Sequence, residues 1–540
     1  MPMNFGDLYD RVDSILQPEV PVFVEEDDAG TCRTVYAGEF KCRTNNLAQQ
    51  LLALGARPDD KIAIYQRNRV EYMETAVAAF KARLVHVNVN FRYREDELYY
   101  LFDNSDTRFV VYDAEFAPVL ENIRARLHKV VAFIEVGAAT ADLEGALAYE
   151  NLVSAGDGKP LQIQRSPEDL IFIYTGGTTG LPKGVMWQHK ALWNMIGRNI
   201  KDPMGTIPQT PADMPLTPSG NQASMITVMP FMHGAGLYSS MNSLAYGNTN
   251  IIMATRGFNP QRVLECIERY QIRVLTIAGD AFAKPLADAL DAHSGKFDLS
   301  SLMVINSTAM IFSPVNKRRI IAHIPDVAIM DNMGSSESPG SATATTTRDS
   351  DLDNKNIVMK LKPNARVFTE DLREVKPGSG EQGFLAVTGD LPVGYYKDDA
   401  KTAEAFVTVD GVRYAKPGDW CELLADGTIK FLGRGNICIN TGGEKVYPEE
   451  VEATLKSHPL VHDCLVVGVP DERWGQVITA VIEPKPGSQP TPEALQAHVR
   501  EHLAGYKVPR HILTIDTIGR AASGKADYPR IKEWVLTALD

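Results

Sequence analysis

Short apolar runs that alternate with helical patterns are the feature that most restricts the fold of this chain. The run 61–65 (KIAIY) is typical of a strand, and 70–82 (VEYMETAVAAFKA) has the spacing of a helix. Further strand-like runs follow at 108–113, 129–136, 169–174, 250–255 and 272–279. Short strands separated by helices indicate parallel sheets that are covered by helices on both faces. The sequence therefore predicts an α/β fold.

The length of the chain and a change of pattern near Gly433 predict two domains. A chain of 540 residues is too long for one ordinary core. After Gly433 come a glycine-rich turn, strand-like runs at 461–469 and 477–484, and a helical pattern at 491–503. These elements suffice for a small α/β domain. We expect an N-terminal domain over 1–433 and a C-terminal domain over 434–540.

Charge and cysteine content exclude several classes of protein. The formal net charge of −13 argues against a nucleic-acid partner, which would need a basic face. No apolar run reaches the length of a transmembrane helix, and the N-terminus lacks the pattern of a signal peptide. The six cysteines form no C-x-x-C pair, so free thiols in a reducing cytoplasm are expected and a structural zinc site is not. Peripheral membrane contact and a homodimer stay open.

The stretch 174–185 (YTGGTTGLPKGV) is glycine-rich and polar, and it directly follows a strand-like run. Glycine permits positive φ, and successive backbone N–H groups turned inward form a concave anion site. Threonine hydroxyls add donors, and Lys183 adds a mobile charge. A polyphosphate is the ligand that suits this set: Thr175, Gly176, Gly177, Thr178, Thr179, Gly180 and Lys183. A Walker loop is excluded, because Gly184 stands where that loop needs the hydroxyl that holds Mg²⁺.

This stretch resembles the phosphate-loop signature of the adenylate-forming superfamily, which includes acyl-CoA synthetases, luciferases and carrier-protein adenylation domains. Segments similar to the family's other motifs follow in the family's order: 230–236 (PFMHGAG), 331–338 (DNMGSSES), 394–406 (GYYKDDAKTAEAF), 414–420 (YAKPGDW), 433–452 (GRGNICINTGGEKVYPEEVE) and 519–525 (GRAASGK). The resemblance covers nearly the whole chain and is strongest to bacterial acyl-CoA synthetases. It implies a large N-terminal domain of parallel sheets flanked by helices and a small, mobile C-terminal α/β domain.

The resemblance implies two half-reactions that use ATP, Mg²⁺, CoA and a small-molecule carboxylic acid. The acid attacks the α-phosphate of ATP to give acyl-AMP and pyrophosphate, and the CoA thiol then attacks the acyl carbon. The glycine loop with Lys183 would hold the β- and γ-phosphates, and Glu337 would bind Mg²⁺. Lys525 would bridge the carboxylate and the α-phosphate, where preorganised positive charge lowers the barrier.

The same resemblance assigns further ATP contacts to Asp331, Ser336, Asp419 and Arg434. Asp419 would accept both ribose hydroxyls. Asp390 stands in a similar local context (VTGD), but only Asp419 follows the Gly-Tyr segment as the family requires. Arg434 would contact ribose or phosphate as a permanent cation, with a salt bridge at the domain boundary as the alternative.

The resemblance assigns three further segments to the acyl pocket, the CoA side of the site and the hinge. His233, with Gly234 and Gly236, would lie at the acyl pocket, where gating, uptake of the thiol proton and a purely structural role all stay open. Gly442 and Gly443 would approach the acyl-AMP when the small domain rotates. The hinge would be Asn436, a residue type that tolerates positive φ. The apolar run after His233 could line a pocket.

Two segments depart from the family pattern. Met333 replaces the aromatic residue that normally lies on the adenine, although a thioether also makes favourable contacts with a π-system. The segment 307–310 (STAM) replaces a Gly-Gly-Ala-Pro sequence. We expect adenine binding to survive the change at Met333, whereas the sequence indicates the adenine contacts of 307–310 less clearly than the phosphate contacts.

The variants of the motifs resemble those of bacterial CoA ligases for medium- or long-chain fatty acids and for steroid side-chain acids. No buried cation follows His233 to fix a second carboxylate, so an apolar monocarboxylic acid is expected. An aromatic acid, and a carrier protein in place of CoA, are the alternatives within the fold. A nucleotide sensor without turnover is a further alternative. The proline-rich segment 202–222 is expected to be a long surface loop, either exposed or covering the acyl channel.

Overall fold

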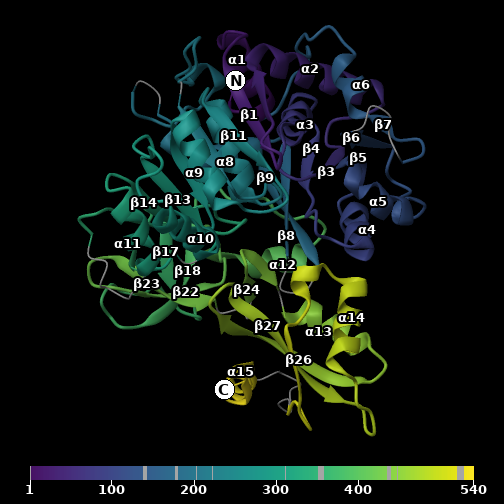
Figure 1. Cartoon of the computed structure of the whole chain (residues 1–540), viewed down its shortest axis with the longest axis vertical. Helices are drawn as coiled ribbons and strands as arrows, with labels where there is room; N and C mark the ends of the chain where they lie inside the picture. The colour runs from purple at the N-terminus through teal and green to yellow at the C-terminus, as the bar shows by residue number, and fades with distance from the viewer. Residues whose placement is uncertain are drawn as a thin grey trace.

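The computed structural model describes residues 2–137, 143–176, 181–201, 204–221, 223–310, 312–350, 358–434, 439–446, 448–519 and 528–539, and all structural statements concern these residues. Figure 1 shows the C-terminal elements, in yellow, below the elements of the rest of the chain. No helix among the described residues combines the length and apolar character that a membrane crossing requires.

The first sheet has a parallel half and an antiparallel half. Its strand order is β2-β1-β11-β10-β12-β13-β14-β15-β16-β23-β22-β18-β21-β20, and β17 pairs with β18. Neighbours from β1 to β14 are parallel, and neighbours from β14 to β20 are antiparallel. The strands are β1 (Pro21–Asp27), β2 (Cys32–Tyr36), β10 (Ser224–Thr227), β11 (Thr249–Ala254), β12 (Ile272–Ile277), β13 (Val304–Thr308), β14 (Ala328–Met333), β15 (Ala342–Thr346), β16 (Val358–Leu361), β17 (Ala365–Phe368), β18 (Gln382–Thr388), β20 (Phe406–Val409), β21 (Val412–Ala415), β22 (Asp419–Leu423) and β23 (Thr428–Arg434).

The antiparallel half goes beyond the parallel sheets that the sequence predicts. Short turns join its strands in place of crossover helices, so neighbouring strands must run in opposite directions. Asp410 and Gly411 join β20 to β21 with φ of 50° and 77°. Two consecutive residues with positive φ are typical of a tight β-hairpin, and Asp-Gly is a preferred pair for it.

The second sheet carries the glycine segment. Its order is β19-β9-β8-β4-β3-β5-β6-β7, and β8 and β9 form an antiparallel pair at one side of a parallel set. The strands are β3 (Lys61–Tyr65), β4 (Val85–Asn88), β5 (Thr107–Asp113), β6 (Ala132–Val136), β7 (Leu147–Ala148), β8 (Leu170–Gly176), β9 (Pro182–Gln188) and β19 (Gly394–Tyr395).

The third sheet lies in the C-terminal part of the chain. Its order is β25-β24-β27-β26, and β28 pairs with β27. The strands are β24 (Ile439–Thr441), β25 (Glu444–Val446), β26 (Val461–Asp471), β27 (Gly475–Pro484) and β28 (His511–Thr514). The first sheet ends in sequence at β23 and the third begins at β24, so sheet membership changes between Arg434 and Ile439. We refer to the parts before and after this change as the large and the small domain, and the exact boundary at 433/434 stays a prediction.

Helices cover the sheets. In the large domain they are α1 (Phe5–Ile15), α2 (Ala37–Ala53), α3 (Val70–Lys81), α4 (Glu95–Asn104), α5 (Ala117–Arg124), α6 (Tyr149–Ser154), α7 (His189–Ile196), α8 (Gly234–Ala245), α9 (Pro260–Tyr270), α10 (Gly279–Ala292), α11 (Pro314–His323) and α12 (Asp399–Ala405). In the small domain they are α13 (Pro448–Ser457), α14 (Pro492–His502) and α15 (Tyr528–Leu539).

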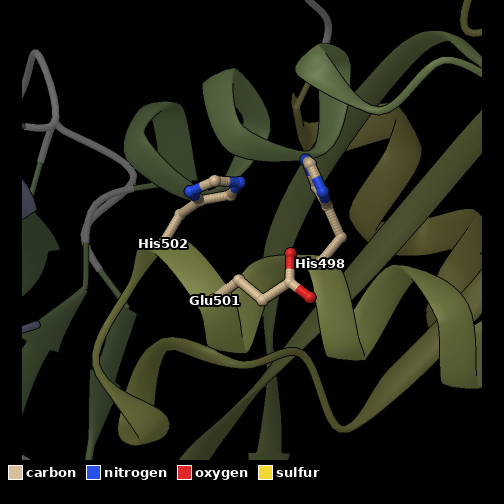
Figure 2. Close-up of side chains that lie close together, drawn as sticks. All are labelled: His498, Glu501 and His502. Atoms are coloured by element: carbon tan, nitrogen blue, oxygen red, sulfur yellow. The ribbon is translucent and has the colours of Figure 1, made fainter.

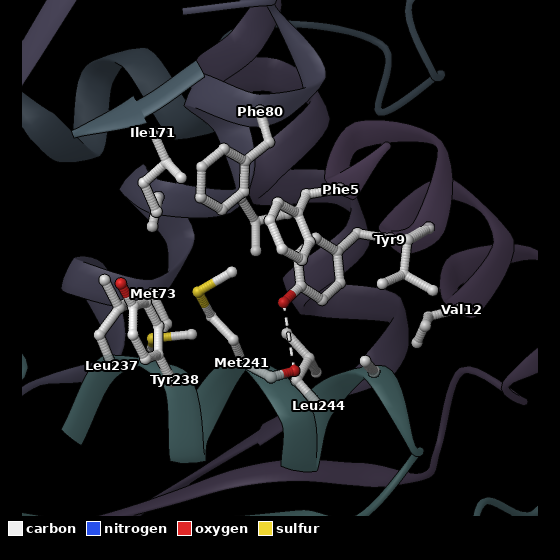
Figure 3. Close-up of a cluster of buried hydrophobic side chains, with 14 of the residues drawn as sticks. Phe5, Tyr9, Val12, Met73, Phe80, Ile171, Leu237, Tyr238, Met241 and Leu244 are labelled. Atoms are coloured by element: carbon white, nitrogen blue, oxygen red, sulfur yellow. Dashed lines mark hydrogen bonds between the residues drawn. The ribbon is translucent and has the colours of Figure 1, made fainter. Parts of the chain in front are cut away.

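A core of buried side chains joins α8 to α1 and α3 (Figure 3). Leu237, Met241 and Leu244 project from one face of α8, and the ring of Tyr9 reaches over from α1. The Tyr9 hydroxyl donates a hydrogen bond to the Met241 carbonyl at 3.2 Å. The apolar run after His233 is therefore a helix whose large side chains fill a core, which fixes the backbone directly behind His233.

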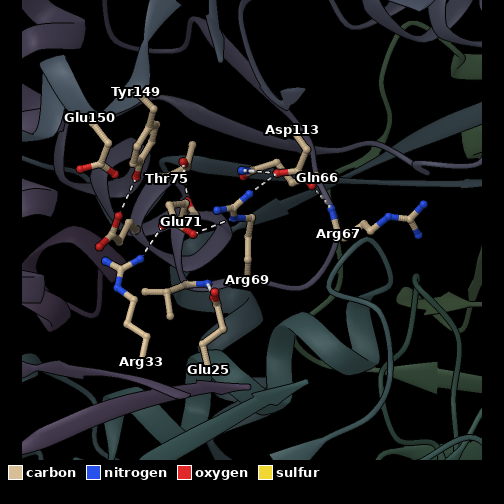
Figure 4. Close-up of polar contacts among 12 residues, drawn as sticks. Glu25, Arg33, Gln66, Arg67, Arg69, Glu71, Thr75, Asp113, Tyr149 and Glu150 are labelled. Carbon is tan, nitrogen blue, oxygen red and sulfur yellow. Dashed lines mark hydrogen bonds and ion pairs between the residues drawn. The ribbon is translucent and has the colours of Figure 1, made fainter. Parts of the chain in front are cut away.

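Buried carboxylates of α3 are paired with arginines (Figure 4). Glu71 accepts hydrogen bonds at 2.7 Å from both Arg33 and Arg69. Burial alone would raise the pKa of the Glu71 carboxyl, but Arg69 and Arg33 together lower that pKa to about 2. Because removing one partner of a buried pair leaves an uncompensated charge, this network makes α3 sensitive to substitution.

Candidate active site

The glycine segment connects two strands of a β-hairpin. Thr175 of β8 faces Lys183 of β9, and Gly176 faces Pro182. A Cβ atom on Gly184 would lie 2.7 Å from the ring of Tyr174, so this position requires glycine. The predicted phosphate contacts Gly177, Thr178, Thr179 and Gly180 lie outside the described residues, as do the hinge residue Asn436 and Lys525.

Tyr395 connects Lys183 to Glu337. The hydroxyl of Tyr395 donates a 2.7 Å hydrogen bond to Oε1 of Glu337, and Nζ of Lys183 lies 5.8 Å from the centre of the Tyr395 ring. Lys183 is buried, and its Nζ lies 3.7 Å from Oδ2 of Asp398. Burial lowers the pKa of the Lys183 ammonium, and Asp398 opposes this effect only in part. Two sequence-predicted site residues thus meet at a tyrosine that the sequence analysis did not single out.

The loop after β14 presents Glu337 through local hydrogen bonds. Oγ of Ser335 accepts from the backbone N–H groups of Glu337 and Ser338, each at 3.2 Å. The carbonyl of Ser336 accepts from the indole of Trp187 at 2.8 Å, which ties the loop to β9. The contact of Ser336 with the rest of the site is therefore through its backbone.

A cavity of about 910 Å³ lies between the two domains. Large-domain residues on its wall are Ser307, Met310, Asp331, Met333 and Asp419. Small-domain residues on its wall are Asn440, Gly468, Gly475, Tyr528 and Lys532. Three segments that are separate in the sequence therefore face one space: the STAM segment, the DNMG segment and the strand of Asp419.

Two aspartates lie on this cavity wall, and Asp419 is buried whereas Asp331 is partly buried. Asp419 is 2% exposed and pairs across the β22–β23 ladder with Arg434, of which only the backbone is described. Asp331 forms a short ion pair with the ammonium of Lys317 from α11. Burial raises the pKa of the Asp331 carboxyl, although Lys317 works against that rise. Lys317 was not predicted, because nothing in its local sequence indicates that α11 faces β14.

His233 is the N-cap residue of α8. Gly236 allows a close approach there, since a Cβ atom would lie 2.5 Å from the carbonyl of Pro230. Asn88 of β4 fixes this segment to the glycine hairpin: Nδ2 donates to the carbonyls of Tyr174 and Met232 at 3.0 and 2.6 Å. The histidine segment and the glycine segment are thus held by one side chain.

The small domain presents the β24–β25 hairpin to His233. Gly442 and Gly443 form its turn, with φ of 57° and 88°. Oε2 of Glu444, the next residue, lies 3.4 Å from Nε2 of His233, and Oε1 accepts a 2.8 Å hydrogen bond from Arg92 of the large domain. Burial alone would raise the pKa of the Glu444 carboxyl, but His233 and Arg92 bring that pKa below its usual value.

A buried ion triad also joins the domains. Nζ of Lys507 donates to Glu97 of α4 at 2.6 Å and to Glu450 of α13 at 2.7 Å. All three side chains are almost fully buried. Beside the triad, Asn90 donates to the hydroxyl of Tyr506 at 3.1 Å. These contacts hold the hairpin of the small domain against the large domain.

Known proteins are similar to this chain over almost its whole length. A family model described as AMP-binding enzyme matches residues 16–396, and its companion C-terminal domain model matches residues 450–525. A medium/long-chain-fatty-acid–CoA/3-oxocholest-4-en-26-oate–CoA ligase of Mycolicibacterium smegmatis is 38% identical over 99% of this chain and 96% of its own length. A 3-oxocholest-4-en-26-oate–CoA ligase of Rhodococcus rhodochrous is 37% identical over 99% of this chain and 96% of its own length.

Solved structures share the fold. The amide bond synthetase McbA of Marinactinospora thermotolerans superimposes with a TM-score of 0.79 over 98% of this chain and 99% of its own, at 23% identity. That likeness extends over both domains.

Proposed function

The chain belongs to the family of AMP-binding enzymes, and on that premise we propose that it is an acid–thiol ligase, an AMP-forming acyl-CoA synthetase. One observation carries the proposal: three family motifs of the large domain line a single cavity whose other wall is the small domain. An enclosed space with convergent polar groups is what a nucleotide-dependent ligase needs. ATP and CoA are the co-substrates that this class of ligase uses.

The first half-reaction joins two anions, so it needs positive charge and hydrogen-bond donors around the phosphorus. We assign Lys183 and the glycine hairpin to the β- and γ-phosphates, and Asp419 to the ribose hydroxyls. The buried position of Asp419 on the cavity wall supports this role. Lys525 is assigned to the bridge between the acid and the α-phosphate on the family resemblance alone.

Glu337 fits the role of the residue that would hold Mg²⁺. Magnesium prefers carboxylate oxygens in combination with phosphate oxygens. The hydroxyl of Tyr395 donates to the Glu337 carboxylate, and the same tyrosine ring lies near Lys183, the residue assigned to the phosphates. When bound, the metal would neutralise charge that develops on the phosphates.

The second half-reaction needs CoA to reach the acyl carbon. The hairpin of Gly442 and Gly443 lies beside His233, which supports the proposal that the domain arrangement described here serves thioester formation. In this arrangement Glu444 would hold His233 in one orientation. A rotation about Asn436 would bring Lys525 in for the first step and the hairpin in for the second.

For the acid, we propose a medium- or long-chain fatty acid or a bulky alicyclic acid of the steroid side-chain type. The names of the two bacterial relatives support this choice. An aromatic acid, or transfer to a carrier protein, remains the alternative. We also propose a cytoplasmic location, which is supported by the described cysteines that form no disulfide: Cys32, Cys42, Cys266, Cys421 and Cys464.

The proposal is tested by incubating the protein with ATP, Mg²⁺ and a panel of acids, with and without CoA, and measuring pyrophosphate and AMP. We expect acid-dependent pyrophosphate release and CoA-dependent release of AMP for an apolar acid. Pyrophosphate without CoA-dependent turnover would indicate a carrier-type enzyme. No product with any acid would support a nucleotide sensor and contradict the proposal.

A further inference from the structure

Three side chains of types that bind metals gather on one face of α14 (Figure 2). His498, Glu501 and His502 each offer a ligand atom, and these atoms lie within 4.8 Å of one another. We propose that this face, which we call the α14 cluster, binds a divalent transition metal of the zinc class. The proposal does not depend on the ligase activity.

The spacing of the cluster follows from the helix. Residues that are three and four positions apart lie on the same helix face, one turn apart. The segment 498–502 (HVREH) therefore brings both imidazoles and the carboxylate to one side of α14. Figure 2 shows the rings of His498 and His502 projecting from the helix on the same side, with the Glu501 carboxylate beside them. Two histidines at this spacing chelate a metal without any change of backbone.

The hydrogen bonds of His498 leave its Nδ1 free to act as a ligand. Nε2 lies 2.8 Å from Oγ of Ser457 and 3.1 Å from the carbonyl of Thr454, both on α13. Because a carbonyl can only accept, Nε2 carries the hydrogen in this geometry and the lone pair of the neutral ring is on Nδ1. An N–H that donates to a backbone carbonyl is the arrangement that usually orients a metal-binding histidine.

A third histidine, His458, lies beside His498 but has its ring nitrogen in use. Nδ1 of His458 accepts a hydrogen bond from the backbone of Leu460 at 3.3 Å, so its lone pair is already used. The ring of His458 packs edge-on against His498, with centroids 5.1 Å apart. His458 therefore supports the position of the His498 ring and is not assigned as a ligand.

The ligand set determines which metal would bind. Two imidazoles and one carboxylate suit Zn²⁺, Co²⁺, Ni²⁺ or Cu²⁺, whereas Mg²⁺ prefers oxygen ligands alone. The three side chains do not belong to the described lining of the active-site cavity. The expectation that a structural zinc site is absent rests on cysteine spacing, which gives no information about a site made of histidines.

The α14 cluster faces an acidic side chain on the other side of the domain boundary. Nδ1 of His502 lies 4.0 Å from Oδ2 of Asp96, which belongs to α4 of the large domain. A metal in the α14 cluster would therefore lie near a carboxylate of the large domain.

The test is a titration of the full-length protein, without an affinity tag, with Co²⁺ in the presence of excess Mg²⁺. We expect the visible absorption bands of protein-bound Co²⁺ to saturate at one equivalent, and Zn²⁺ to remove them by displacement. Replacing either ligand, as in His498→Gln or His502→Gln, is expected to weaken binding by more than about tenfold, because even the loss of a group that only orients a ligand costs about 10–100-fold. The matched control is His511→Gln, an exposed histidine of the same domain that is outside the cluster.

Two results would overturn the proposal. One is the absence of these Co²⁺ bands in the wild-type protein. The other is a Co²⁺ affinity that is the same in His498→Gln and His502→Gln as in the wild type. Circular dichroism of each variant establishes that it is folded, since a glutamine in place of a partly exposed histidine leaves the helix intact.

Discussion

At the scale of single residues, the candidate site depends on contacts between side chains that are far apart in the sequence. Glu444 of the small domain contacts both His233 and Arg92 of the large domain. Tyr395 similarly connects Glu337 with Lys183. Each contact assigns a measurable role to a side chain.

The pairing of Glu444 with His233 predicts a defect that is confined to thioester formation. Glu444→Gln removes the negative charge that faces His233, and a hydrogen bond to a charged group contributes about 1.5–3 kcal/mol. We expect the transfer of a supplied acyl-AMP to CoA to slow by about tenfold or more, with acid-dependent pyrophosphate release almost unchanged. Rapid-quench assays of the two half-reactions measure this difference. The control is the exposed Glu533→Gln, and a similar loss in both half-reactions would contradict the role given to Glu444.

Lys525 is predicted to act in the opposite half-reaction. Lys525→Ala removes the charge that would bridge the acid and the α-phosphate, and the loss of one such preorganised group costs about 10²–10³-fold in rate. Acyl-AMP formation should fall by this factor, whereas supplied acyl-AMP should still be converted to acyl-CoA. Lys532→Ala, on the cavity wall in the same domain, is the matched comparison. If Lys525→Ala impairs both steps equally, the assignment fails.

The sequence predicted these residues better than it predicted their partners. Glycine, lysine and aspartate in ordered motifs identify the segments, because each residue type supplies a defined chemistry at a defined spacing. Tyr395, Arg92 and Lys317 carry no such local signal, and their roles follow only from the way that distant elements pack. The roles given to the side chains of Lys525 and Arg434, and the hinge role of Asn436, remain predictions.

At the scale of helices and strands, the alternating pattern predicted the parallel half of the large domain correctly. It missed the antiparallel half, where turns such as Asp410–Gly411 replace helices. By its sequence the run after His233 could line a pocket, and in the structure its leucines and methionine follow helical spacing and fill a core. Alternation of small and apolar residues is ambiguous between these two structures until the packing partner, here α1, is known.

The contact between helices that can be tested most directly is the ion triad of Lys507. In Lys507→Met the carboxylates of Glu97 and Glu450 lose their shared cation, and breaking a buried ion pair costs about 3–5 kcal/mol. We expect the domain arrangement described here to lose population, so that thioester formation slows more than adenylation. Small-angle scattering and the half-reaction assays report this change.

Lys485→Met is the control for this prediction, because Lys485 is an exposed lysine of the same domain. Unchanged scattering and unchanged thioester formation in Lys507→Met would show that the triad does not hold the arrangement.

The hinge predicted at Asn436 gives a second element-scale test. Proline fixes φ near −65°, so Asn436→Pro restricts the rotation that we propose between the two half-reactions. We expect the second half-reaction to lose more activity than the first. Asn440→Pro is not a suitable control, because the backbone N–H of Asn440 is hydrogen-bonded. Asn436→Ala, which leaves φ free, is the appropriate comparison. Equal loss in both half-reactions would refute the hinge.

At the scale of the whole molecule, two domains enclose one cavity, and the account requires that a carboxylic acid be joined to AMP within it. The large domain supplies Asp331 and Asp419 to the wall of this cavity, and the small domain supplies Asn440 and Tyr528. The α14 cluster lies outside this cavity, so metal binding there and ligase activity can be tested separately.

The most direct test of the central claim follows the oxygen atoms of the acid. A fatty acid labelled with ¹⁸O in its carboxylate is incubated with the protein, ATP, Mg²⁺ and CoA, and the products are analysed by mass spectrometry. If the carboxylate attacks the α-phosphate, one ¹⁸O atom must appear in AMP and the other must remain in the acyl-CoA. AMP without label, or label in inorganic phosphate together with ADP, would contradict the account.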